Sequence, residues 1–332
     1  MNAAASRARC GVRRFGHRVA VRSAPVRAHG VACRCRRVPG LLRRGWCWLR
    51  APANEVAFAL RATLRLGRGQ PRRVPSAVSD DALFPAAESA ERAVAQALAH
   101  RFDLAPLAAE DRRVRRANLA RLDALERLSR GITLPHGPDD VLRAVDIGCG
   151  DFHYAVSLQQ GLSRHGGGAR RVVLRGIEVD GYGLYRDGHS RADHARARAA
   201  AASVRTSLVR FEVADATRFA LPPQDVVTLF FPFLTRYACL AWGAPLSRFA
   251  PDRLLRCAVA ALRPGGLLVV ANQTVAEHAA LLRRLRGLPV IRIARRWFRS
   301  ALLPPEAAAA AAGQVGSIWL RQSDIPSGKP IG

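Results

Sequence analysis

Three acidic side chains and one glycine turn stand where the hydropathy pattern predicts that strands end. Asp146 closes an apolar run and is followed at once by Gly148 and Gly150, while Glu178 and Asp215 close the next two apolar runs. Glycines let a ligand approach the backbone closely, and carboxylates accept hydrogen bonds from hydroxyl and amino groups. The pattern predicts a site for a nucleotide-like ligand at the ends of neighbouring strands.

A dinucleotide is disfavoured as that ligand. The fingerprint for a dinucleotide needs a third glycine three residues after the second, and His153 stands there. The chain also lacks a Tyr-x-x-x-Lys pair, because Lys329 is its only lysine. A ligand without phosphates, which offers a ribose diol, an adenine, an amino-acid end and a sulfonium, fits the three acids better.

The elements that position these residues alternate between strands and helices from about residue 140 onward. The predicted strands are 141–147, 171–178, 207–213, 225–231 and 267–272, with 290–294 and 315–321 closing the sheet as a hairpin. The predicted helices of this region are 152–165, 185–202, 251–262 and 275–286. Such alternation predicts an α/β fold with a doubly wound, seven-stranded, mostly parallel sheet.

Five segments carry a resemblance to a known family. They read, in chain order, VDIGCGD, GIEVD, FEVADAT, VVTLFFPF and LRPGGLLVVANQ. In order and spacing they resemble the motifs of class I S-adenosylmethionine-dependent methyltransferases, over residues 140–322. The chain is further similar to bacterial members without an assigned substrate, which share its D-F-x-Y, F-F-P-F and W-G-x-P-L elements. The resemblance implies a Rossmann-like methyltransferase fold and S-adenosyl-L-methionine as cofactor.

The resemblance also implies roles for individual residues. Asp146 would orient the methionine end of the cofactor through water or the turn, Glu178 would hold the ribose hydroxyls, and Asp215 would meet the adenine. The full set of implied cofactor-binding residues is Asp146, Gly148, Cys149, Gly150, Glu178, Asp215 and Ala216. Each acid is also compatible with an ordinary turn or strand-end role, and Asp180 is an alternative ribose ligand.

The segment after the fourth strand is expected to face the reacting methyl group. It reads Phe230-Phe231-Pro232-Phe233, whereas family members that methylate amide or ring amino nitrogens often carry a polar residue before the proline. The long connection 232–250 is expected to be a substrate-facing lid or a small hydrophobic cluster. The predicted substrate-pocket residues are Phe231, Pro232, Phe233, Tyr237 and Trp242.

Catalytic side chains are not fixed by the sequence, because methyl transfer needs a base only when the acceptor arrives protonated. His189, His194 and Tyr154 are candidates, and surface or packing roles are the alternative for each. No pairing of histidines with carboxylates has metal-ligand spacing, so no metal is predicted.

Charge and composition divide the chain. Of the formal net charge of +28, residues 1–75 supply +17, from 18 arginines and one acid, Glu55. We expect four parts: a basic, disordered tail (1–75) with a short helix near 53–66, a helical segment (76–138) with helices 86–101 and 110–130, the methyltransferase domain (139–323) and a C-terminal tail (324–332). An arginine-rich surface attracts RNA, but arginine-favouring codons of a GC-rich genome explain 52 arginines beside one lysine equally well.

The seven cysteines show no disulfide or zinc pattern, and the sequence contains no apolar run of membrane-spanning length. A cytoplasmic location is expected. The sequence therefore predicts a methyltransferase that acts on an unidentified acceptor, most simply a small molecule. The alternatives are an RNA methyltransferase, and a non-catalytic nucleic-acid-binding or scaffold protein with the same fold.

Overall fold

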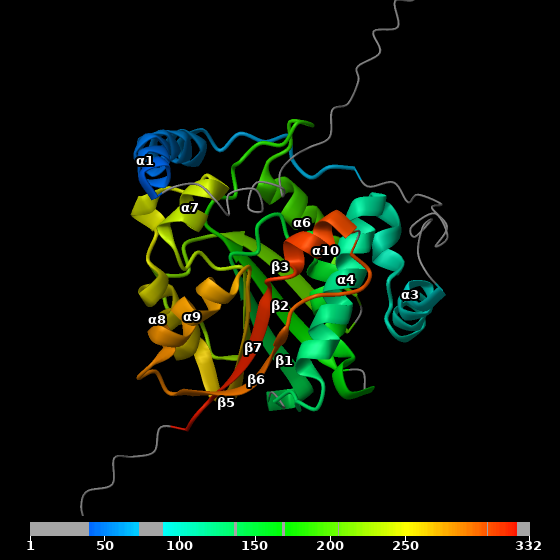
Figure 1. Ribbon diagram of the computed structural model, residues 1–332. Helices are drawn as coiled ribbons and strands as arrows, with labels where there is room; N and C mark the ends of the chain where they lie inside the picture. The colour runs from blue at the N-terminus through cyan, green and yellow to red at the C-terminus, as the bar shows by residue number, and fades with distance from the viewer. Residues whose placement is uncertain are drawn as a thin grey trace, which may run out of the picture. The chain divides into compact units, whose positions relative to one another are not determined.

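The central feature of the computed structural model is a seven-stranded sheet of order β3-β2-β1-β4-β5-β7-β6 (Figure 1). Its strands are β1 (Val141–Ile147), β2 (Arg171–Glu178), β3 (Ser207–Val213), β4 (Gln224–Phe230), β5 (Leu262–Asn272), β6 (Val290–Trp297) and β7 (Val315–Arg321). Strands β1 to β5 pair in parallel, whereas β7 runs antiparallel to β5 and β6. The predicted α/β architecture, with a closing hairpin on a mostly parallel sheet, is confirmed.

The structure describes residues 40–72, 89–135, 138–167, 170–204, 206–303 and 305–323, all within one compact unit, Val38–Gly332. Its helices are α1 (Gly40–Leu64), α3 (Ser89–Arg101), α4 (Arg112–Ser129), α5 (Ala155–Ser163), α6 (Arg191–Ala202), α7 (Arg236–Trp242), α8 (Pro251–Ala261), α9 (Val275–Leu285) and α10 (Pro305–Ala311). The described residues also contain four 3-10 turns, Ala105–Ala109, Pro138–Asp140, His165–Gly167 and Leu246–Arg248. None of the described helices combines the length and the apolar character that crossing a membrane requires.

Helices cover both faces of the sheet, which explains why its central strands are buried along almost their whole length. In β4 all seven residues are buried. Val226 and Phe230 point into a core shared with α4, α5 and α6, whereas Val227 and Leu229 point into the opposite core, shared with α8 and α9. The two groups of helices lie on different sides of the sheet in Figure 1. This arrangement leaves the carboxyl ends of β1 to β4 free to form a site.

Helix α1 differs from the expected tail. It spans 25 residues with Pro52 inside it, and its extent exceeds the predicted helix 53–66. The side chain of Asn54 is buried and donates to the carbonyl oxygens of Leu240 (3.1 Å) and Ala244 (3.0 Å). Residues 1–39 and 73–75 of the predicted tail, and the tail 324–332, lie outside the described residues. Part of the segment that was predicted to be a disordered tail is therefore a helix, which makes contacts with residues distant in sequence.

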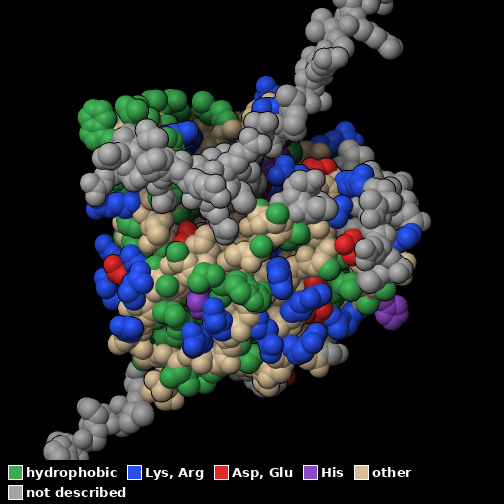
Figure 2. Space-filling view, in the orientation of Figure 1, with side chains coloured by type: hydrophobic (Ala, Val, Ile, Leu, Met, Phe, Trp, Pro, Cys, Tyr) green, Lys and Arg blue, Asp and Glu red, His purple; other side chains and the backbone are tan. Residues whose placement is uncertain are grey.

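One side of α1 is covered by no other described element. Apolar side chains gather over this helix in Figure 2, and Trp48, Leu49, Val56 and Leu60 are more than half exposed. The arginines of the same helix and this apolar stripe give α1 an amphipathic, basic surface.

Two further elements begin or end differently from the prediction. Helix α6 begins at Arg191 and not at 185, because the Ser190 hydroxyl caps it and Asp193 returns a hydrogen bond to the Ser190 backbone. The connection 232–250 is not an irregular loop, since it contains α7, capped by Thr235, and the turn Leu246–Arg248.

Candidate functional site

The carboxyl end of β1 carries a fully buried acid. Asp146 has no exposed surface and accepts hydrogen bonds from the Tyr154 hydroxyl (2.8 Å) and the Thr228 hydroxyl (2.6 Å). Burial raises the pKa of Asp146 to about 6, although both hydrogen bonds act in the opposite direction. Burial also raises the pKa of Tyr154 well above its usual value, so this hydroxyl keeps its proton and donates a hydrogen bond to Asp146. Asp146 therefore positions Tyr154 and does not itself reach a surface.

The glycine turn after β1 is unobstructed on one side and hydrogen-bonded to β2 on the other. Gly148 and Gly150 have φ angles of +79° and +60°, which other residues adopt with strain. Among the described residues, no heavy atom lies within 4 Å of the position that a Cβ would take at either glycine. Below the turn, the backbone N–H groups of Gly148 and Cys149 donate to the Ile177 carbonyl. The Cys149 side chain is buried, so the open surface of the turn is backbone.

Glu178 joins the two strand ends on which the site depends. Its Oε2 accepts from the backbone N–H of Gly150 (2.9 Å), and its Oε1 accepts from the backbone N–H of Asp180 (2.9 Å). The side chain is only 6% exposed. Because a carboxylate offers about four acceptor positions, Glu178 can still accept two further hydrogen bonds from a ligand.

Asp180 and Asp215, at the ends of the second and third strands, lie in ion pairs. Asp180 accepts both N–H groups of the Arg61 fork (3.1 and 2.9 Å) and lies 3.4 Å from Arg191 Nη1. Asp215 accepts from Arg248 (2.9 Å) and lies 3.2 Å from Arg218. Most of the hydrogen-bond acceptor positions of both carboxylates are therefore already occupied by arginines.

Asp215 is also held by its own turn. The backbone N–H and the hydroxyl of Thr217 both donate to its Oδ1. Burial opposes ionisation, but Thr217 and Arg248 hold the pKa of Asp215 below its usual range. The adjacent Ala216 is buried in the core beside α8. The structure thus places Asp215 and Ala216 at the expected edge, with the carboxylate already engaged by protein groups.

Helix α1 contributes to this ion-paired edge. Arg61 supplies the partner of Asp180, Glu55 binds the backbone N–H and hydroxyl of Ser247, and Phe58 lies beneath the Arg248 guanidinium at 5.4 Å. This contribution is not visible in the sequence, because arginines are so frequent in the first 75 residues that Arg61 does not stand out.

Arg121 of α4 is a second residue that the sequence did not reveal. Its guanidinium carbon lies 4.6–5.6 Å from the ring centres of four aromatic residues, Tyr154, Phe230, Phe231 and Phe298. Its Nη1 is buried and makes no hydrogen bond to any described residue. Desolvation lowers the pKa of Arg121, and the nearby Tyr154 and Asp146 oppose this shift. An enclosed guanidinium with a free N–H group is suited to receiving an anion.

The residues predicted for the substrate pocket separate into two groups. Phe231 has a φ of +59°, a strained conformation for a non-glycine residue, and its backbone N–H donates to the Ala271 carbonyl (2.7 Å). It contacts Arg121 beside β4, as expected for a residue at this edge. Pro232 directly follows and leads the chain toward α7.

The remaining pocket candidates lie on or near α7. The ring of Phe233 lies 6.2 Å from that of Trp242, and Arg191 stands over Trp242 at 5.6 Å. The ring of Tyr237 lies 5.2 Å from that of Trp46 on α1. These contacts place Trp242 near the ion-paired edge, through Arg191, and they place Tyr237 against α1.

The two candidate histidines are brought together with an acid. His194 Nε2 lies 3.0 Å from Asp187 Oδ2, and His189 Nδ1 lies 3.4 Å from the same oxygen. The ring of Tyr185 packs edge-on against His194. Desolvation and Arg198 lower the pKa of His194, which favours its neutral form.

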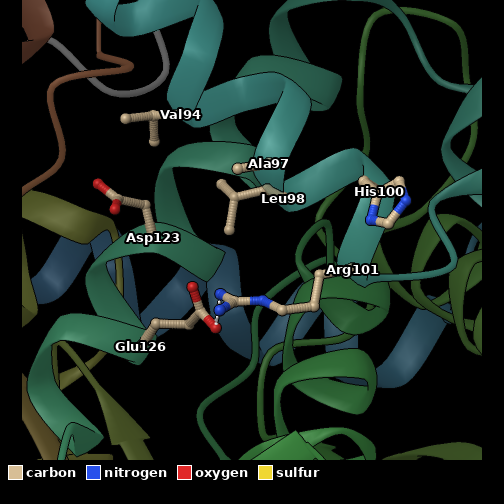
Figure 3. Close-up of a pocket in the computed structure, with 7 residues that line it drawn as sticks. All are labelled: Val94, Ala97, Leu98, His100, Arg101, Asp123 and Glu126. Atoms are coloured by element: carbon tan, nitrogen blue, oxygen red, sulfur yellow. Dashed lines mark ion pairs between the residues drawn. The ribbon is translucent and has the colours of Figure 1, made fainter.

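A pocket of about 380 Å³ lies elsewhere, between α3 and α4. Figure 3 shows its lining, with an ion pair between Arg101 and Glu126 at one end. The lining residues are Val94, Ala97, Leu98, His100, Arg101, Asp123 and Glu126. None of the predicted site residues belongs to it, and the polar groups that the strands bring together lie at the β1–β4 edge.

No protein-family model matches the chain, and no curated protein matches it. Solved structures do resemble it. TrmN from Thermus thermophilus is 20% identical over 60% of this chain, with a TM-score of 0.39, and this chain spans about half (48%) of that protein's length.

Two further structures cover more of the chain. A SAM-dependent methyltransferase from Aquifex aeolicus is 11% identical, covers 68% of this chain and 98% of its own, and has a TM-score of 0.39. The geranyl diphosphate C-methyltransferase of Streptomyces coelicolor is 15% identical, covers 76% and 88%, and has a TM-score of 0.40. Both of these structures are methyltransferases, and identities of 11% and 15% with TM-scores of 0.39 and 0.40 assign no activity to this chain.

Proposed function

We propose that this chain is an S-adenosylmethionine-dependent methyltransferase that acts on a small-molecule acceptor. The observation that carries the proposal is the bridge made by Glu178. This buried carboxylate binds the backbone of the open glycine turn after β1 and of the chain after β2, and it retains acceptor positions. A ribose diol laid across the turn would donate to those positions.

The methionine end of the cofactor fits the cluster around Arg121. This end carries a carboxylate, and Arg121 has a buried N–H group that binds no described residue. Asp146 lies nearby but has no exposed surface and already accepts hydrogen bonds from Tyr154 and Thr228, so its role is to hold Tyr154 against the guanidinium. A charge-assisted hydrogen bond in such an enclosed place is stronger than one at the surface.

The adenosine end fits the ion-paired edge. Glu178 would hold the ribose, while Asp215 and Ala216 would line the adenine position through the backbone, since the Asp215 carboxylate is engaged by Thr217 and Arg248. Asp180, paired with Arg61, would support this edge without contacting the ribose.

When bound, the cofactor supplies a methyl group on a sulfonium, which is displaced in line by the acceptor. The protein's contribution is to align the two partners and to exclude water. Phe230, Phe231 and Phe298 form an apolar wall around the place where the end of β4 meets Arg121. Such a wall favours a small, partly apolar acceptor that brings its own nucleophilic atom.

Calorimetric titration of the full-length chain with S-adenosylhomocysteine tests the cofactor part of the proposal. We expect saturable binding of one molecule per chain. Absence of saturable binding would overturn the proposal.

Transfer of a radiolabelled methyl group from S-adenosylmethionine tests the acceptor. The chain would be incubated separately with a metabolite extract and with total RNA, and we expect label in the small-molecule fraction. Label confined to RNA would show that the acceptor is RNA and not a small molecule. Binding of S-adenosylhomocysteine without methyl transfer in either fraction would favour a non-catalytic module.

A further inference from the structure

We propose that Asp187, His189 and His194 form a binding site for a divalent transition-metal ion, with Zn²⁺ as the ion that fits best. The three side chains each offer one ligand atom, and all three atoms lie within 4.8 Å of one another. The sequence spacing gave no sign of such a site. The inference does not depend on the proposed methyl transfer.

The fold preorganises the three side chains. Between β2 and α6 the chain turns back on itself: Gly188, with a φ of +80°, donates to the Tyr185 carbonyl, and Tyr185 donates to the His189 carbonyl. The capped start of α6 then places His194 one turn after Ser190. A tight turn and a fixed helix end hold the ligands together without relying on an extended loop.

The spacing of the ligand atoms is close to that of metal coordination. Asp187 Oδ2 lies 3.0 Å from His194 Nε2 and 3.4 Å from His189 Nδ1. Bonds to Zn²⁺ of about 2.0–2.2 Å in a tetrahedral site put neighbouring ligand atoms about 3.3–3.6 Å apart. A small rotation of the exposed Asp187 side chain would let an ion sit between the three atoms.

One ligand atom lacks a hydrogen bond. His189 Nδ1 is buried, and apart from its 3.4 Å ion-pair contact with Asp187 Oδ2 it makes no hydrogen bond to the described part of the chain. The backbone N–H of His189 donates to Asp187 Oδ1 (3.0 Å), which fixes the carboxylate and leaves Oδ2 directed at the two rings. A buried polar nitrogen normally has a partner, and a metal ion would supply one here.

The donor set suits a transition-metal ion. Two imidazole nitrogens and one carboxylate oxygen are common ligands of Zn²⁺. Two histidines and one carboxylate leave at least one coordination position for water or a ligand.

An ion at this place would tie the turn before α6 to the first turn of that helix. The same stretch carries Arg191, which binds the backbone carbonyl of Asp180 (2.8 Å). The metal would therefore stiffen the segment that supports the ion-paired edge of the sheet.

Cobalt titration tests the proposal directly. The tag-free full chain would be stripped of metal by a chelator and titrated with Co²⁺, whose visible absorption reports coordination by protein ligands, and Zn²⁺ would then compete. We expect one saturable site without thiolate absorption, and loss of at least about 10- to 100-fold in affinity in D187N, H189A and H194A. Because the N-terminal segment contains Cys33 and Cys35, all proteins would carry C33S and C35S.

The exposed His100 of α3 provides the matched control. H100A is expected to bind Co²⁺ as the parent protein does, and circular dichroism verifies that each variant is folded. The exposed Asp187 keeps the test decisive, because D187N removes a ligand from the surface without opening the core. Absence of saturable Co²⁺ binding, or equal binding by D187N and H100A, would overturn the proposal.

Discussion

The two ends of the proposed cofactor site are built on different physical principles. Around Asp146, burial dominates: the acid has no exposed surface, and Arg121 lies among four aromatic rings. Around Asp180 and Asp215, ion pairs with the partly exposed Arg61 and Arg248 dominate. Desolvated groups resist salt and respond strongly to substitution, whereas partly exposed pairs are screened and contribute little each. We therefore expect a rigid methionine end and an adaptable adenosine end.

The largest effect is expected from pH at the buried end. An acid whose pKa rises from 3.8 to about 6 on folding stabilises the fold fully below pH 3.8 and loses that contribution as pH rises through 6. The difference in unfolding free energy between the wild-type chain and D146N should therefore fall by about 3 kcal/mol from pH 3 to pH 7. Urea unfolding at several pH values measures it, and a constant difference would show that Asp146 ionises as freely as a surface acid.

Arg121 tests the same end through binding. R121M should weaken S-adenosylhomocysteine binding by about 2–3 kcal/mol, because the ligand carboxylate loses its charged partner. Binding of 5′-methylthioadenosine, which has no carboxylate, should be unchanged. R130M, at the exposed end of the same helix, serves as control. If R121M weakened the binding of both ligands equally, Arg121 would not be the partner of the ligand carboxylate.

Glu178 lies between the two ends and should affect both ligands alike. E178A is expected to cost about 1–3 kcal/mol in affinity for S-adenosylhomocysteine and for 5′-methylthioadenosine, because both carry the ribose. Glu212 on the neighbouring strand, paired with Arg175, provides the control E212A. Wild-type affinity in E178A would move the ribose contact to Asp180 or elsewhere.

The smallest effect is expected at the ion-paired edge. R61A should reduce S-adenosylhomocysteine affinity by less than about 1 kcal/mol, since Arg191 remains near Asp180 and partly exposed pairs are weak. The reduction should shrink further as salt rises. A loss as large as that of R121M, insensitive to salt, would abolish the distinction between the two ends.

The sequence predicted the central strands β1 and β4 closely because nearly all of their residues are buried, and β3 because its residues alternate between buried and exposed. β1, β2, β3 and β7 begin and end at the predicted residues, and β4 is displaced by one. Continuous apolar runs bounded by Gly, Pro and Asp leave little freedom in assigning such strands. Asp146, Glu178 and Asp215 were placed at one edge of the sheet for the same reason.

What the sequence could not supply are the contacts between distant segments. Pro52 and the surrounding arginines obscured α1, whose order depends on Asn54 binding carbonyls almost 190 residues away. Arg121 is one arginine among 52, and only the fold encloses it in aromatic rings. The saturation of Asp215 by Arg248 and the meeting of Asp187 with the histidines likewise depend on tertiary packing.

A crystal structure of the chain with S-adenosylhomocysteine tests the central claim most directly. The account predicts that the ribose hydroxyls donate to Glu178 above the Gly148–Gly150 turn and that the ligand carboxylate binds Arg121. An empty cleft, or a ligand whose carboxylate lies at the Asp215 edge, would contradict it.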